Sequence, residues 1–87
     1  MDSENCFVCN SNVDISDLGN YIAKQGYQIG IIWGRRKGQL IVSLRSIGDM
    51  DVSIIAKDFG GGGHKNASGF TLNTFMDLKK FLKVKEK

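Results

Sequence analysis

Residues 27–45 read YQIGIIWGRRKGQLIVSLR, and this stretch decides the fold. Its two arms, 27–33 and 39–45, are rich in β-branched, aromatic and other apolar side chains, which favour extended strands. The segment between the arms, 34–38, begins and ends in glycine and holds three bases, as is typical of a turn. The stretch therefore predicts an antiparallel hairpin.

The second arm of this hairpin predicts two different faces, because successive side chains of a strand point to opposite sides of its sheet. One face carries Leu40, Val42 and Leu44. The other carries Ile41, Ser43 and Arg45. We therefore expect Ser43 and Arg45 to point the same way.

Shorter elements are predicted on both sides of the hairpin. They are a strand over 6–9, a helix over 15–25, a helix over about 52–59, a strand over 66–72 and a helix that starts after Thr74. Asp51 and Thr74 stand where N-cap side chains are needed. This order predicts an α+β (mixed α/β) fold, a central mixed β-sheet of about four to five strands flanked by about three helices.

The length allows one domain, residues 1–87, and no second one. Hydrophobic residues make up 41% of the chain, yet no apolar run approaches the roughly 20 residues that a membrane helix needs. The polar, acidic start MDSEN lacks the basic and apolar regions of a secretory signal. We therefore expect a cytoplasmic protein with no membrane partner.

Cys6 and Cys9 form a C-x-x-C pair, a spacing found in zinc sites and in redox-active dithiols. A closed zinc site needs four ligands, and the chain adds only one histidine, His64, and no further cysteine. A redox pair usually opens a helix, whereas these cysteines lie in a short apolar run. We expect buried strand cysteines and no cofactor or metal in this chain.

The run GGGGHKNASG, residues 60–69, is the part of the sequence that can carry chemistry. Each glycine loses more conformational entropy on folding than another residue would, so four in a row need a physical reason. We expect their N–H groups to form one concave nest for phosphate oxygens, with His64 and Lys65 as donors at its rim. A valine at Gly62 would then force the loop out of shape. A plain helix-to-strand connector is the alternative.

Two familiar glycine motifs are excluded for this run. A Walker A loop needs Gly-Lys-Ser/Thr and leads into a helix, whereas Gly63 precedes His64 and a strand is predicted to follow. A dinucleotide fingerprint needs glycine at its sixth position, where Lys65 stands, and a strand rather than a helix before it.

Three segments together, SLRS at 43–46, FGGGGH at 59–64 and ASGF at 67–70, resemble the DHH-associated domain, the C-terminal domain of DHH-family phosphoesterases. The resemblance covers nearly the whole chain. It implies that the glycine-histidine loop and the arginine of the preceding strand contact phosphate or base. With Ser43 and Asn66 added from the strand face and the run, the candidate substrate-binding residues are Ser43, Arg45, Gly61, Gly62, Gly63, His64 and Asn66.

The resemblance also implies partners. They are a short nucleic acid or nucleotide phosphate ligand, and an N-terminal DHH domain of the same polypeptide that holds manganese and performs hydrolysis. A homodimer through the parent protein is a further expectation. The chain has one histidine, no Asp-His-His motif and scattered acids, so we expect an excised domain without catalytic residues, from an oligonucleotide exonuclease or nucleotide phosphatase.

Two alternatives remain beside this interpretation. A stand-alone nucleic-acid-binding domain would use the basic turn Arg35-Arg36-Lys37 and the C-terminal lysines, although such lysines are typical of a solvated helix face. A complete small hydrolase would use His64 and Asp58, and the shortage of metal ligands disfavours it. The sequence leaves the substrate open among RNA, DNA, cyclic dinucleotides, phosphoadenosine phosphate and pyrophosphate.

Overall fold

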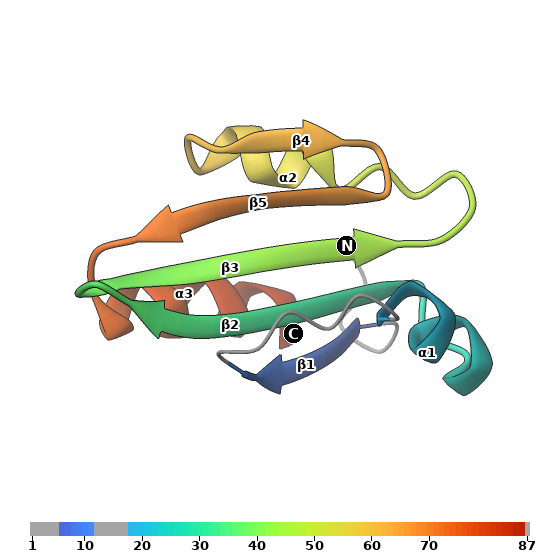
Figure 1. Ribbon diagram of the computed structural model, residues 1–87, viewed down its shortest axis with the longest axis horizontal. Coiled ribbons are helices and arrows are strands. Elements are labelled where there is room, and N and C mark those ends of the chain that lie inside the picture. The colour runs from blue at the N-terminus through green and yellow to red at the C-terminus, as the bar shows by residue number, and fades with distance from the viewer. Residues whose placement is uncertain (1–5, 12–17, 87) are drawn as a thin grey trace.

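The computed structural model describes residues 6–11 and 18–86, which form five strands and three helices. In chain order these are β1 (Cys6–Asn10), α1 (Leu18–Gln25), β2 (Ile29–Arg36), β3 (Gln39–Ser46), α2 (Ser53–Asp58), β4 (Gly62–His64), β5 (Ala67–Leu72) and α3 (Phe75–Glu86). The strands make one sheet in the order β1-β2-β3-β5-β4, with β1 parallel to β2 and the other pairs antiparallel (Figure 1). The predicted α+β fold with a mixed sheet is confirmed.

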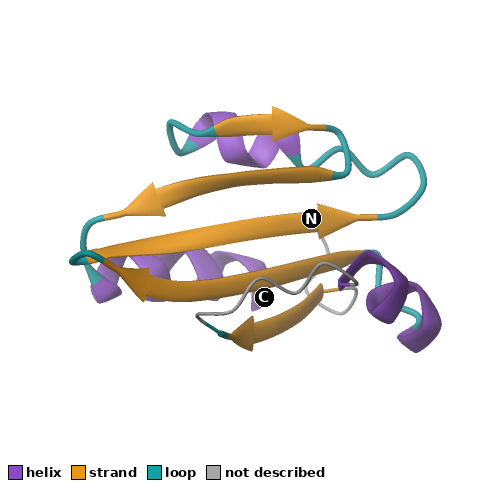
Figure 2. Cartoon of the chain, viewed as in Figure 1, coloured by secondary structure: helices purple, strands orange, loops and turns teal. Residues whose placement is uncertain are grey.

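The main core lies on the sheet face covered by α2 and α3 (Figure 2). It contains the apolar face of β3 that the period of two predicts, since Leu40, Val42 and Leu44 are all fully buried there. Phe70 of β5 and Phe81 of α3 meet edge to face at 5.2 Å in the same core. Helices α2 and α3 thus lie on the side of the sheet away from Ser43 and Arg45.

A smaller cluster lies on the opposite sheet face, under α1. Ile22 of this helix packs on Ile32 of β2, with Phe7, Tyr27 and Ile47 around them. Helix α1 contacts β2 and β3. The strands β4 and β5 are contacted mainly by α2 and α3, on the other face. The second face is therefore covered at one end only.

The β2–β3 hairpin has a tighter turn than the sequence predicts. The strands continue to Arg36 and resume at Gln39, so only Lys37 and Gly38 form the turn. Both have positive φ, 51° and 81°, as a type I′ turn requires. The predicted turn over 34–38 is too long, because the twist of a two-residue primed turn lets the strands pair up to the turn itself.

The strand β4 is absent from the sequence prediction, which treats residues 60–65 as a connecting loop. Gly62, Gly63 and His64 instead pair with Gly69, Ser68 and Ala67 of β5. Glycine has a low β propensity, which hides the strand in the sequence. The pairing closes a second hairpin, and its turn is Lys65-Asn66.

The helix ends differ little from those predicted. Helix α2 spans Ser53–Asp58, one residue shorter at each end than the predicted 52–59. For α1 the described part begins at Leu18, and the predicted start at residues 15–17 lies outside the described residues. Thr74 does cap α3, since its Oγ1 accepts the N–H of Asp77 at 3.1 Å. No helix in the described ranges is long and apolar enough to cross a membrane.

Candidate functional site

The candidate residues meet on the uncovered part of the sheet, because the strand register aligns them in two rows. In the first row Arg45 of β3 lies opposite Ala67 of β5, which lies opposite His64 of β4. In the second row Ser43, Gly69 and Gly62 are aligned in the same way. Directly paired residues share a face, so Arg45, Ser43 and His64 stand on one surface with a floor of small residues between them.

Arg45 is half-buried and held by one bond, since its Nη1 donates to the Leu44 carbonyl at 2.9 Å. No carboxylate of the described residues forms an ion pair with Arg45. A guanidinium has five N–H donors in a planar fork. Most of the donors of Arg45 thus remain for a ligand on the uncovered face.

His64 ends the edge strand β4, and its ring is exposed. Its backbone is fixed by pairing with Ala67 and by the Ser68 hydroxyl, which donates to the His64 carbonyl at 2.5 Å. Ser68 itself is 5% exposed, so this anchor lies inside the protein. The imidazole is therefore carried on a fixed strand end across Ala67 from Arg45.

The glycines of the run have different roles. A Cβ on Gly61 would collide with the Gly69 carbonyl oxygen, and a Cβ on Gly63 would lie 2.6 Å from the Ala67 carbonyl oxygen. Gly63 also has a φ of 142°, a backbone angle that residues with a side chain rarely adopt. Gly62 has nothing within 4 Å of its Cβ position and no positive φ, so the expectation that valine there must distort the backbone is wrong.

The predicted nest of four glycine N–H groups is also wrong in part. The Gly60 N–H donates to the Lys57 carbonyl at 3.1 Å, and the Gly61 N–H donates to the Ala56 carbonyl at 2.8 Å. These two donors close the end of α2 instead of facing a ligand. Because Gly62 and His64 pair with β5, the run builds a flat strand beside the site rather than a concave loop.

Asn66 is tied to the β3–α2 connection. Its Nδ2 lies 2.9 Å from the Ser46 hydroxyl and 3.3 Å from the carbonyls of both Gly48 and Met50. This amide positions the β4–β5 turn, and a direct contact of Asn66 with substrate stays a prediction.

Ser46 is a positioning residue that the sequence analysis does not identify. It is 5% exposed, its hydroxyl donates to the Met50 carbonyl at 2.6 Å, and its N–H donates to the Asn66 carbonyl at 3.1 Å. The available signal was the strand period, which puts a hydroxyl two residues after Leu44 on the core face. A buried hydroxyl needs partners, and here the partners are the turn beside the site.

The two acidic side chains of the β3–α2 connection, Asp49 and Asp51, are both bonded within the protein. The Ser53 hydroxyl and N–H both donate to Asp51 Oδ1, at 2.5 and 2.9 Å. The hydroxyl bond is the main cause that lowers the pKa of Asp51 below its ordinary value. Asp49 pairs with the exposed Lys65 at 3.2 Å. The expected N-cap position of Asp51 is wrong by one residue, because Val52 is the N-cap residue and has no side-chain cap bond, although Asp51 still accepts the Ser53 N–H.

The part of the chain that the structure describes holds no group of three or more His, Cys, Asp or Glu side chains placed to share a metal ion. Cys6 and Cys9 lie on β1 and are not joined in a disulfide, and both are half-buried rather than buried as expected. Three residues apart on a strand, they point to opposite faces and cannot share one ion. The described residues therefore do not fit a two-metal hydrolytic centre.

Comparison with known proteins gives a family match over most of the chain. Residues 8–87 match the DHHA1 domain. An uncharacterized protein of Acanthamoeba polyphaga mimivirus is 42% identical over 82 residues, which is 87% of this chain and 19% of that protein. Oligoribonuclease NrnB of Bacillus subtilis (strain 168) is 45% identical over 58 residues, 66% of this chain and 14% of the enzyme. The chain thus spans less than a fifth of the length of these relatives.

A solved structure has the same fold. The pGpG-specific phosphodiesterase PggH of Vibrio cholerae superimposes with a TM-score of 0.71 at 14% identity, over 92% of this chain and 31% of that one. At this identity the likeness concerns the fold.

Proposed function

The chain belongs to the DHHA1 domain family, and from this premise we propose that it is the phosphate-binding module of a DHH-family phosphoesterase that acts on oligonucleotides or nucleotides. The name of the Bacillus subtilis relative, an oligoribonuclease, supports this substrate class. The uncovered sheet face also supports it, because the hydrogen-bond donors on this face outnumber its acidic groups.

One observation carries the proposal: the register puts Arg45 and His64 on the same face, on either side of Ala67. A guanidinium binds two phosphate oxygens with its fork, and charge-assisted bonds of this kind are about twice as strong as neutral ones. His64 adds an N–H donor from the opposite side, and Ser43 adds a hydroxyl in the next row. The Ala67 and Gly69 floor leaves room for a ribose or base against the backbone.

Hydrolysis is assigned to another part of the parent protein. A DHH domain that holds manganese would supply the metal-activated water, because two-metal centres need clustered carboxylates and imidazoles. The contribution of this chain is then to bind the phosphate at the end of the oligonucleotide and to orient the oligonucleotide. Arg45, Ser43 and His64 hold the ligand while bond cleavage takes place in the neighbouring domain.

Calorimetric titration of the chain with the 5′-phosphorylated dinucleotide pApA tests the proposal. Arg45→Gln should weaken binding about tenfold, the loss expected for one partly exposed charge-assisted contact. Lys80→Gln, an exposed charge on α3, is the matched control and should change the affinity by less than about twofold. Equal affinities of the two variants would contradict the proposal.

A further inference from the structure

The uncovered face of the sheet continues beyond the candidate site to the other end of the strands. Ser43, Ile41 and Gln39 follow Arg45 along the same face of β3, and none of the face positions from Ile41 to Arg45 is buried. Arg36 of β2 is paired with Gln39, so it belongs to this face as well. Figure 1 places the β2–β3 turn at the opposite end of the strands from the β4–β5 turn.

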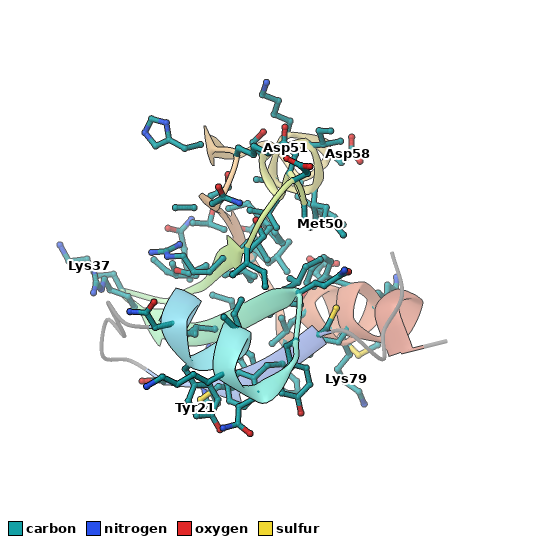
Figure 3. The ribbon with its side chains drawn as sticks, turned by 90° about the vertical axis from the view of Figure 1, so that its right-hand side faces the viewer. Tyr21, Lys37, Met50, Asp51, Asp58 and Lys79 are labelled. Carbon is teal, nitrogen blue, oxygen red and sulfur yellow. The ribbon has the colours of Figure 1, made fainter. Side chains whose placement is uncertain are left out.

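The charge on this part of the molecule has one sign. Residues 29–46 and 62–72, which contain β2 to β5 and both hairpin turns, include no Asp or Glu. They include five bases, Arg35, Arg36, Lys37, Arg45 and Lys65. Figure 3 shows Lys37 extending from the side of the sheet that faces away from α3, whereas Asp51 and Asp58 lie beside α2. Arg36 and Arg45 lie on the uncovered face and Lys37 extends from it, so this face offers positive charge to a polyanion at both of its ends.

From this arrangement we infer that the face is a track for a single-stranded oligonucleotide, held by Arg45 and His64 at one end and by Arg36 and Lys37 at the other. The inference rests on the proposed function and extends it, since it assigns a second contact region and a longer substrate. We name the surface formed by Arg36, Gln39, Ile41, Ser43, Arg45, Gly69 and Thr71 the strand track.

The length of the strand track sets the length of its ligand. Arg45 lies six positions after Gln39, which is about 20 Å at roughly 3.3 Å per strand residue. A stacked strand has one charge per about 3.4 Å, so about six nucleotides reach from end to end, and fewer if the strand is extended. A dinucleotide is too short to touch both ends.

The surface chemistry favours a nucleic acid over other polyanions. Ile41 and the small residues Ala67 and Gly69 form a flat strip on which bases can lie, flanked by the hydroxyls of Ser43 and Thr71. The basic side chains lie at the two ends of the strip, where they can bind phosphates of one and the same oligonucleotide. An acidic peptide would use the charges but gain nothing from the flat strip.

The test is a titration of 5′-phosphorylated oligoadenylates of two, four and eight nucleotides, followed by fluorescence anisotropy. The variant Arg36→Gln/Lys37→Asn removes both charges at the far end and leaves an Asn-Gly turn, which suits a type I′ hairpin. Lys79→Gln/Lys80→Gln removes the same charge from exposed positions of α3, on the opposite side of the molecule (Figure 3). Circular dichroism and thermal unfolding check that both variants fold.

We expect the hairpin variant to bind the octamer about five- to tenfold more weakly and the dimer within about twofold of the unsubstituted chain. The slope of log affinity against log salt for the octamer should fall by about 1.4, from two lost contacts at roughly 0.7 each. The α3 variant should change neither length selectively. Octaglutamate should fail to displace the octamer at an equal concentration of charges.

Each other outcome is decisive. No loss for the octamer, an equal loss at every length, or displacement by octaglutamate overturns the strand track. Arg45→Gln without effect on the dimer overturns the proposed function instead, because the dimer touches only that end. A chain that binds none of the three oligonucleotides overturns both.

Discussion

At the scale of single residues, the glycine run shows that identical residues have unlike roles. Gly61 and Gly63 are required by close backbone contacts with β5, whereas Gly62 faces the open surface. The sequence predicts that the run matters, because four glycines are entropically costly. It does not predict which glycines the backbone needs, since that depends on the partner strand.

Alanine at Gly63 should therefore lower the stability, whereas alanine at Gly62 should not. Gly63→Ala forces a side chain onto positive φ and against Ala67 and Ser68, and should lower the free energy of unfolding by about 2 kcal/mol or more. Gly62→Ala should leave it unchanged or raise it by up to about 1 kcal/mol. Urea unfolding measures both, and similar losses for the two variants would show that the contacts with β5 are not the reason for the glycine.

The affinity of Gly62→Ala for pApA shows whether the floor of small residues contributes to binding independently of stability. Its methyl group would stand on the uncovered face in the row of Ser43 and Gly69. If the stability of this variant is unchanged, a reduced affinity for pApA would come from the added methyl group alone.

At the scale of elements, the two hairpins differ in how well the sequence predicts them. The β2–β3 hairpin follows from β-branched residues and a basic glycine turn, and its alternation correctly puts Ser43 and Arg45 on one face. The β4–β5 hairpin does not follow, because glycine hides β4. It is held by hydrogen bonds between Ser46 and Asn66. No local sequence pattern predicts such contacts between residues about 20 positions apart.

Removal of the Asn66 amide should thus act on the whole second hairpin. Asn66→Ala loses the contacts to Ser46, Gly48 and Met50 and should lower the free energy of unfolding by about 1 to 2 kcal/mol. The affinity for pApA should fall as well, because the turn that places His64 loosens. Asn73→Ala, at an exposed position after β5, is the control. A stability equal to that of the control would show that the amide does not position the turn.

At the scale of the whole molecule, the sheet brings together residues from three strands that lie far apart in the sequence, yet it collects no metal ligands among the described residues. On the proposed function, this site binds a phosphate group and another domain of the parent protein supplies the metal-activated water, so binding and cleavage are separate tasks. The chain spans 19% and 14% of the length of its two relatives.

The chain supplied with manganese should accordingly release no mononucleotide from pApA, while it still binds pApA in the same buffer. Chromatographic separation of the products measures this. His64→Ala provides the background rate, and turnover above that background would show that this chain contains a catalytic centre.

The short strand β4 also bears on how the protein behaves at high concentration. A sheet edge offers unpaired N–H and C=O groups to any neighbouring chain, and long apolar edges promote aggregation. Here the edge is three residues long and ends beside the charged Lys65, with residues alternating inward and outward, so a second molecule finds one or two free backbone groups. On the β4 side, the short edge thus leaves a second copy little backbone with which to extend the sheet.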